Sequence, residues 1–172
     1  MREHRKIRPR EPMELVGTNR LCSVSLDIGI DLSRSLQLER NVAIDDLLVE
    51  NSFELVGHTK GPYILDLLLR GTRLAFRVST ENGIPVVSHI VGLGPFRDAI
   101  DNYKTICEAH VAAVRGKDPY RIEAIDMGRR AAHNEAALLL RERLSSKIKM
   151  DDMTARRLFT LISLLAMSGI LL

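Results

Sequence analysis

The chain has 172 residues and a net charge of +3; it contains no tryptophan, and aromatic residues make up only 4% of it. This length fits one domain with a single sizeable core. The scarcity of aromatic side chains argues against a nucleic-acid surface that stacks bases on rings. We therefore expect a core built mainly from Leu, Ile, Val and Ala side chains.

Most of the positive charge lies in the first ten residues, where five basic side chains stand against one glutamate. Together with Pro9, Pro12 and Gly17, this charge predicts a flexible basic arm over residues 1–19 and a single domain over residues 20–172. Such arms are usually solvated tails, and contact with nucleic acid or acidic lipid is the alternative. No apolar run follows the basic segment, which argues against a signal peptide.

Cys22 and Cys107 lie far apart, and neither belongs to a CxxC or Cys/His motif. This pattern favours buried thiols in a reducing compartment over a disulfide, so we expect a cytoplasmic protein. The uncharged run Leu158–Leu172 is shorter than the roughly 20 residues of a membrane span, and Gly169 interrupts it. We expect a core helix here, with a membrane anchor as the alternative.

The first half of the chain changes its hydrophobic period twice. Residues 20–28 alternate between apolar and polar side chains, which predicts a half-buried strand. Residues 33–51 repeat at helical spacing, with Ser35 as the candidate N-cap. The apolar face expected for this helix consists of Leu38, Val42, Leu47 and Leu48. Residues 53–62 are rich in glycine and are expected to be a connector.

Three strand-like runs follow, over residues 63–70, 73–79 and 84–91. The short connection at Gly71 and the Asn-Gly pair at 82–83 favour tight hairpins, so these runs are expected to be adjacent antiparallel strands. The strand over residues 20–28 is expected at an edge of the same sheet. Pro85 argues that the third run is not centrally paired, because proline cannot donate a ladder hydrogen bond.

Three helices are expected in the C-terminal half. The first begins at Gly94-Pro95 and ends at Gly116. Its apolar stripe is expected to comprise Phe96, Ile100, Tyr103, Ile106, Cys107, Val111 and Val114. The second helix covers residues 121–144 and follows the cap-like pair Asp118-Pro119. After a short extended segment at 147–150, the last helix covers residues 154–166, with Asp151 or Asp152 as its cap.

Strands and helices are segregated along the chain, in the order β-α-β-β-β-α-α-(β)-α. Segregation of this kind is typical of α+β proteins and not of alternating βαβ units. We therefore predict a single-domain α+β fold in which a small antiparallel β-sheet packs against several α-helices.

The helix over residues 121–144 carries the densest group of polar side chains. Arg129 projects within its expected apolar face, His133 lies at the edge, and Asp126 is one turn from Arg130. That apolar face consists of Ile122, Ile125, Ala132, Ala136 and Leu140, and further small residues beside it (Gly128, Ala131, Ala137) would let another element approach. A charge on a buried face needs a partner, because an isolated buried charge is heavily penalised.

This polar group has two interpretations. In the structural one, Arg129 is tied to Asp126 or to backbone carbonyls, and His133 is a satisfied core histidine. In the functional one, Arg129, Arg130 and His133 face a cleft and bind a phosphate or carboxylate. Arg156 and Arg157 lie in the first turns of the last helix, where they oppose its macrodipole, and they would extend such an anion-binding surface.

Common catalytic motifs are absent from the sequence: there is no phosphate-binding glycine loop, no GxSxG elbow and no HExxH pair. The five histidines are dispersed, so we expect no metal site and no cofactor. Cys107 and His110 are one turn apart and could form a nucleophile and base. Because the cysteine lies on an apolar stripe, core packing is the favoured interpretation of this pair.

One set of motifs comprises IEAIDMGRR, the following HNE, and TARRLFTLI. A second set comprises VAIDDLLVENSFELVG, GPY and LGPFR. Both sets resemble Uncharacterised Protein Family 0262, a group of small bacterial proteins, and the likeness runs from about Arg20 to Ile162. The resemblance implies a family without an assigned function, and so it supplies no mechanism.

We therefore expect a cytoplasmic, non-catalytic binding or regulatory module that contacts an acidic protein or an anionic ligand. The residues expected to make this contact are Asp126, Arg129, Arg130, His133, Arg156 and Arg157. One alternative is an enzyme acting on a phosphorylated or carboxylated small molecule, with His133 as the acid or base. The other alternative is nucleic-acid contact led by the basic arm. Neither nucleic acid nor a membrane is the expected partner.

Overall fold

The computed structural model describes residues 18–27, 32–58 and 60–169, so most of the expected basic arm lies outside the described residues. The predicted α+β class is confirmed. The elements are β1 (Leu21–Asp27), α1 (Arg34–Val49), β2 (Phe53–Leu55), β3 (Tyr63–Arg70), β4 (Arg73–Thr80), β5 (Pro85–Gly92), the 3₁₀ turn η1 (Gly94–Phe96), α2 (Arg97–Arg115), α3 (Pro119–Leu144), β6 (Ile148–Met150) and α4 (Asp152–Gly169).

The main sheet has four strands in the order β1-β3-β4-β5. Strands β3, β4 and β5 form the predicted antiparallel meander, and β5, which begins at Pro85, lies at an edge as expected. Strand β1 occupies the other edge but runs parallel to β3, so the sheet is mixed and the prediction of a purely antiparallel sheet is wrong. The reason is the intervening helix α1, which returns the chain to the same end of the sheet before β3 begins.

A second, two-stranded sheet joins β2 to β6. The prediction that residues 53–62 are only a connector is therefore wrong, because Phe53–Leu55 pairs antiparallel with Ile148–Met150. The extended segment expected at 147–150 does contain this strand. Phe53 and Leu55 are buried, and the alternation is too short to be recognised in sequence.

Helix α1 turns only part of its predicted apolar face to the core, because Leu47 and Leu48 face inward and Leu38 and Val42 do not. Leu38 and Val42 are 60% and 59% exposed. The inward-facing side chains are Leu36, Ala43, Ile44, Leu47 and Leu48. Its N-cap is Ser33, whose hydroxyl accepts a hydrogen bond from the Leu36 amide at 3.3 Å, and not Ser35. Apolar residues occur all round this helix, so packing against α4 selects the buried face and periodicity alone does not.

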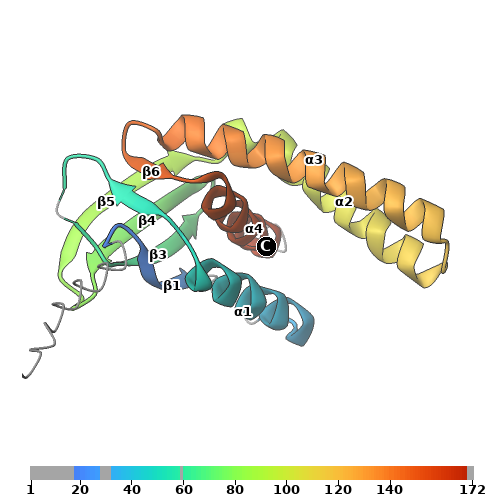
Figure 1. Ribbon diagram of the computed structural model, residues 1–172, viewed down its shortest axis with the longest axis horizontal. Helices are drawn as coiled ribbons and strands as arrows, with labels where there is room; N and C mark the ends of the chain where they lie inside the picture. The colour runs from blue at the N-terminus through green and yellow to red at the C-terminus, as the bar shows by residue number, and fades with distance from the viewer. Residues whose placement is uncertain (1–17, 28–31, 59, 170–172) are drawn as a thin grey trace, which may run out of the picture.

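Helix α4 is the centre of the core. All four helices lie on one side of the main sheet, with α4 between the sheet and the other three (Figure 1). Leu158, Phe159 and Leu161 are fully buried, which confirms the predicted core helix. Asp151 caps it by accepting a hydrogen bond from the Thr154 amide at 2.7 Å. Within the described ranges, no helix is long and apolar enough to cross a membrane.

Helices α2 and α3 form a long antiparallel hairpin that extends beyond the sheet (Figure 1). Ala113, Ala132 and Ala136 are buried where the helices meet, so these small residues allow the close approach that the sequence predicted. Gly128 does not contribute, because an added Cβ there would meet nothing within 4 Å. The outer part of the hairpin extends beyond the core. Val111 is therefore about half exposed, although it belongs to the apolar stripe predicted for this helix.

Asn51 connects α1 to the edge of the sheet and provides a test of this arrangement. Its side-chain oxygen accepts a hydrogen bond from the Leu21 amide at 2.7 Å, and its side-chain nitrogen donates to the Leu21 and Leu47 carbonyls at 3.1 and 3.0 Å. Asn51→Ala leaves backbone groups of the buried Leu21 without partners, so we expect the free energy of unfolding to fall by about 1–3 kcal/mol in urea denaturation. The control Asn41→Ala, at an exposed position, should change it by less than about 0.5 kcal/mol. Equal effects of the two substitutions would contradict this role for Asn51.

Candidate functional site

Asp126 lies between two arginines on the surface of α3. Its Oδ1 accepts a hydrogen bond from Arg129 Nη2 at 2.6 Å, and its Oδ2 lies 3.1 Å from Arg130 Nη2. The hydrogen bond from Arg129 holds the pKa of Asp126 below its usual value. Arg129 is therefore tied to a carboxylate, as the structural interpretation expects, and Asp126 offsets part of the charge that the two guanidinium groups present.

His133 points from α3 toward α4 and is held by two oxygens. Its Nε2 lies 2.8 Å from the Arg156 carbonyl oxygen and 2.9 Å from the Thr160 hydroxyl. A carbonyl only accepts, so Nε2 carries the proton. Burial lowers the pKa of His133, and the hydrogen bond to the Arg156 carbonyl opposes that shift. The imidazole is therefore neutral near pH 7, and its ring packs against Tyr103 at a centroid distance of 5.1 Å.

Arg156 and Arg157 have separate environments. Arg157 donates a hydrogen bond from Nη1 to the Glu50 carbonyl at 2.8 Å and so satisfies a backbone oxygen at the end of α1. Arg156 accepts the His133 hydrogen bond through its backbone carbonyl, and its Nη1 lies 3.7 Å from the sulfur of Met153. The six predicted residues thus fall into three groups, namely the Asp126 ion pairs, the His133–Arg156 hydrogen bond, and the Arg157 cap.

A cavity of about 350 Å³ lies between α1, α2 and α4, beside the His133 hydrogen bonds. Its polar lining includes Tyr103, Cys107 and Thr160, none of which was predicted as a site residue. Burial raises the pKa of Tyr103 and that of Cys107, so both side chains stay protonated near pH 7. A thiol with a raised pKa is a poor nucleophile, which supports a packing role for Cys107 over the nucleophile–base alternative.

The face of the main sheet opposite the helices carries a different group of charges, which we call the open face. Arg70, Arg73 and Arg77 surround a hollow of about 260 Å³ whose floor is formed by Leu68, Ala75 and Ile90. Leu68 is buried, yet it lies outside the main core cluster, in keeping with its place on the face away from the helices.

Only one of these three arginines is neutralised within the described structure. Arg70 forms a 2.7 Å ion pair with Asp27, whereas Arg73 and Arg77 have no ion-pair partner among the described residues. Arg70 and Arg73 are also directly opposite each other in the β3–β4 ladder. Like charges in that position destabilise a sheet, so folding stability does not explain the Arg70–Arg73 pair, whereas Arg77 lies opposite Asp66.

The arginines of the open face were not among the predicted site residues, although the sequence contains a signal for them. Arg73 and Arg77 alternate with the core residues Leu74, Phe76 and Val78 along one strand. Alternation predicts only that such residues face away from the core. It does not show that no helix of the described residues covers the outward face, or that the third arginine comes from the neighbouring strand.

The fold and these surfaces define a small α+β protein in which the described residues cover one face of the main sheet with helices and leave the other face open. The chain belongs to Uncharacterised protein family (UPF0262), whose model matches residues 18–168, and the resemblance inferred from the motifs is confirmed.

The chain is similar over most of its length to several UPF0262 proteins. It is 52% identical to one from Rhizobium meliloti over 151 residues, which cover 87% of this chain and 96% of the relative. It is 49% identical to one from Rhizobium leguminosarum bv. trifolii over 154 residues, 89% of this chain and 98% of the relative. A relative from Hyphomonas neptunium is 47% identical over 150 residues, covering 86% and 92% of the two chains. No solved structure matches the chain.

The lowered pKa of His133 predicts a specific pH dependence of stability. Below the ordinary histidine pKa of 6.5, the unfolded chain takes up a proton that the folded imidazole does not, so the free energy of unfolding falls as the pH decreases. We expect His133→Gln to reduce the stability lost between about pH 7.5 and about pH 5.5 in urea denaturation. Part of the dependence should persist, because burial also lowers the pKa of His89. An NMR titration in which His133 ionises above 6.5 would refute this assignment.

Proposed function

We propose that this chain is a non-catalytic binding module that docks an acidic segment of a partner protein on its open face. The observation that carries the proposal is the pair Arg73 and Arg77, which have no ion-pair partner among the described residues and lie beside an apolar hollow. An unpaired guanidinium offers planar donors that match a carboxylate in bidentate geometry. The free thiols Cys22 and Cys107 fit the reducing conditions of the cytoplasm, where we place the module.

The chemistry of the open face favours an acidic protein segment over nucleic acid. Single-stranded nucleic acids usually stack bases on aromatic rings, and the three arginines surround only the aliphatic side chains of Leu68, Ala75 and Ile90. A peptide whose carboxylates alternate with aliphatic side chains can contact both the arginines and the aliphatic floor of the hollow.

Electrostatics sets the strength expected for this contact. A single exposed ion pair contributes about 0.2–1 kcal/mol. Two or three such pairs therefore give moderate affinity only when apolar contact with the floor is added. Because exposed charges are screened by salt, the affinity is expected to fall as ionic strength rises.

The Asp126 group and His133 are less suited to the primary contact. Asp126 already pairs with both Arg129 and Arg130, so an incoming carboxylate would compete with an existing one. His133 is neutral near pH 7, and its Nε2 proton is directed to the Arg156 carbonyl and the Thr160 hydroxyl. These features support a role in holding α3 against α4.

The proposal is tested with a synthetic peptide that alternates glutamate and leucine, titrated into isotopically labelled protein and followed by amide NMR shifts. We expect the shifts to concentrate on β3 and β4, and the double substitution Arg73→Glu with Arg77→Glu to weaken binding by about tenfold or more. The matched control is the double substitution Arg115→Glu with Arg121→Glu, at two exposed positions at the tip of the α2–α3 hairpin. It changes the net charge by the same amount as the double substitution on the open face. The same peptide with glutamine in place of glutamate separates charge from apolar contact.

Two outcomes would contradict docking on the open face. One is a control variant that weakens binding as much as the Arg73/Arg77 variant, because the effect would then come from net charge alone. The other is a set of shifts that centres on α3 around Asp126, which would return the contact to the group predicted from sequence.

A further inference from the structure

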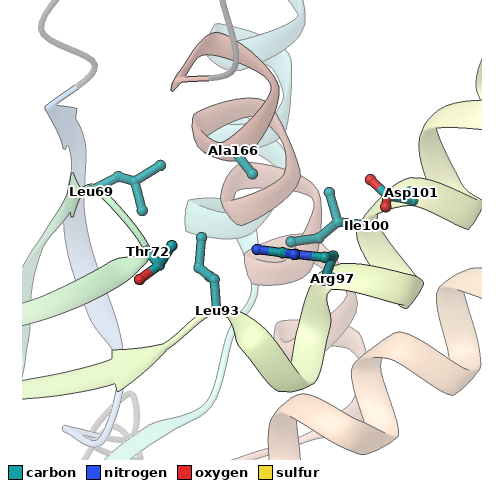
Figure 2. Close-up of a pocket in the computed structure, with 8 residues that line it drawn as sticks. Leu69, Thr72, Leu93, Arg97, Ile100, Asp101 and Ala166 are labelled. Carbon is teal, nitrogen blue, oxygen red and sulfur yellow. The ribbon is translucent and has the colours of Figure 1, made fainter. Parts of the chain in front are cut away.

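A separate cavity of about 340 Å³ lies on the helix side of the sheet, where the β3–β4 turn meets the start of α2 and the last turns of α4. Its walls include Leu69, Thr72, Leu93, Arg97, Ile100 and Ala166. Figure 2 shows the Arg97 guanidinium extending toward Leu93 and into the space between these elements, with Asp101 one turn further along α2. The volume falls within the range of small-molecule pockets in proteins, at its lower end.

The position of Arg97 is not explained by the stability of α2. It is the first residue of that helix, where a cation opposes the helix macrodipole. Asp101 is one turn away on the same helix, but no ion pair forms between them. Within the described part of the chain, Arg97 therefore presents at the cavity a cation that no ion pair holds, although Asp101 also lines the cavity.

The rest of the wall is predominantly apolar. Ile100 and Ala166 are 4% and 7% exposed and belong to the main core cluster, and Leu69 and Leu93 pack against that cluster while remaining partly open. The Thr72 hydroxyl is the neutral polar group among these side chains. An occupant must therefore place an apolar body on the aliphatic wall and an anionic end at Arg97.

We infer that this cavity binds a small carboxylic acid with an apolar body. A carboxylate accepts the parallel donors of one guanidinium, and a single negative charge matches a single cation. Asp101 also borders the cavity and disfavours a group of higher negative charge, such as a phosphate dianion. The inference is independent of the open face, because Arg70, Arg73 and Arg77 surround a different hollow.

The probe is octanoate, measured by calorimetry and by methyl NMR on the full chain. We expect saturable binding with shifts at the methyl groups of Leu69, Leu93 and Ile100. Arg97→Gln should weaken octanoate binding by about tenfold, as expected for the loss of one charge-assisted hydrogen-bonded pair. Arg121→Gln is the matched control, because Arg121 is an exposed arginine in the first turn of α3, and it should leave the affinity unchanged.

Two further probes separate charge from apolar contact. 1-Octanol has the same body without the charge and should bind wild type and Arg97→Gln equally, and more weakly than octanoate binds wild type. Acetate has the charge without the body and should not saturate the cavity. Equal affinity of octanoate and octanol for the wild type would overturn the inference, as would an Arg97→Gln variant that binds octanoate unchanged. Octanoate shifts that appear only on the open face would also overturn it.

Discussion

The rest of the structure depends on the burial of α4 from Leu158 onward. Its side chains Leu158, Phe159, Leu161 and Ile162 are at most 2% exposed, and each contributes about 1.5–3 kcal/mol through removal from water. A helix segment with so many apolar residues must be covered on most of its sides, so the sheet covers one face and the other helices pack against the rest. The buried hydroxyl of Ser163 returns to the Phe159 carbonyl within the helix, so this polar group needs no partner from outside.

Several polar residues that suggested a site in the sequence instead support this buried helix. His133 reaches from α3 to the backbone of α4, and Arg157 reaches from α4 to the end of α1. Both contacts join two elements through a backbone carbonyl that accepts a hydrogen bond from a side chain. A histidine or arginine on a mostly apolar helix is therefore ambiguous in sequence, because the same residue types suit an anion site and a backbone cap.

Local patterns were sufficient to predict the helices and the meander, but not the arrangement of the elements around α4. The apolar residues of α4 and the Asn-Gly turn before β5 specify their own local structure. The parallel pairing of β1 with β3 and the burial of Leu36 in place of Leu38 depend on contacts between distant segments. The same limit applies to the candidate sites, because alternation placed Arg73 and Arg77 outside the core without showing what lies beside them.

The arginines of this chain differ mainly in whether a carboxylate or carbonyl already accepts their hydrogen bonds. Arg129 and Arg157 have such acceptors, so their positions follow from the folded chain alone. Arg73, Arg77 and Arg97 have no ion pair in the described structure. Local effects oppose the placement of two of them, namely repulsion from Arg70 across the β3–β4 ladder for Arg73 and the macrodipole of α2 for Arg97. A residue that costs stability and gains no internal partner is better explained by a ligand outside the chain than by the fold.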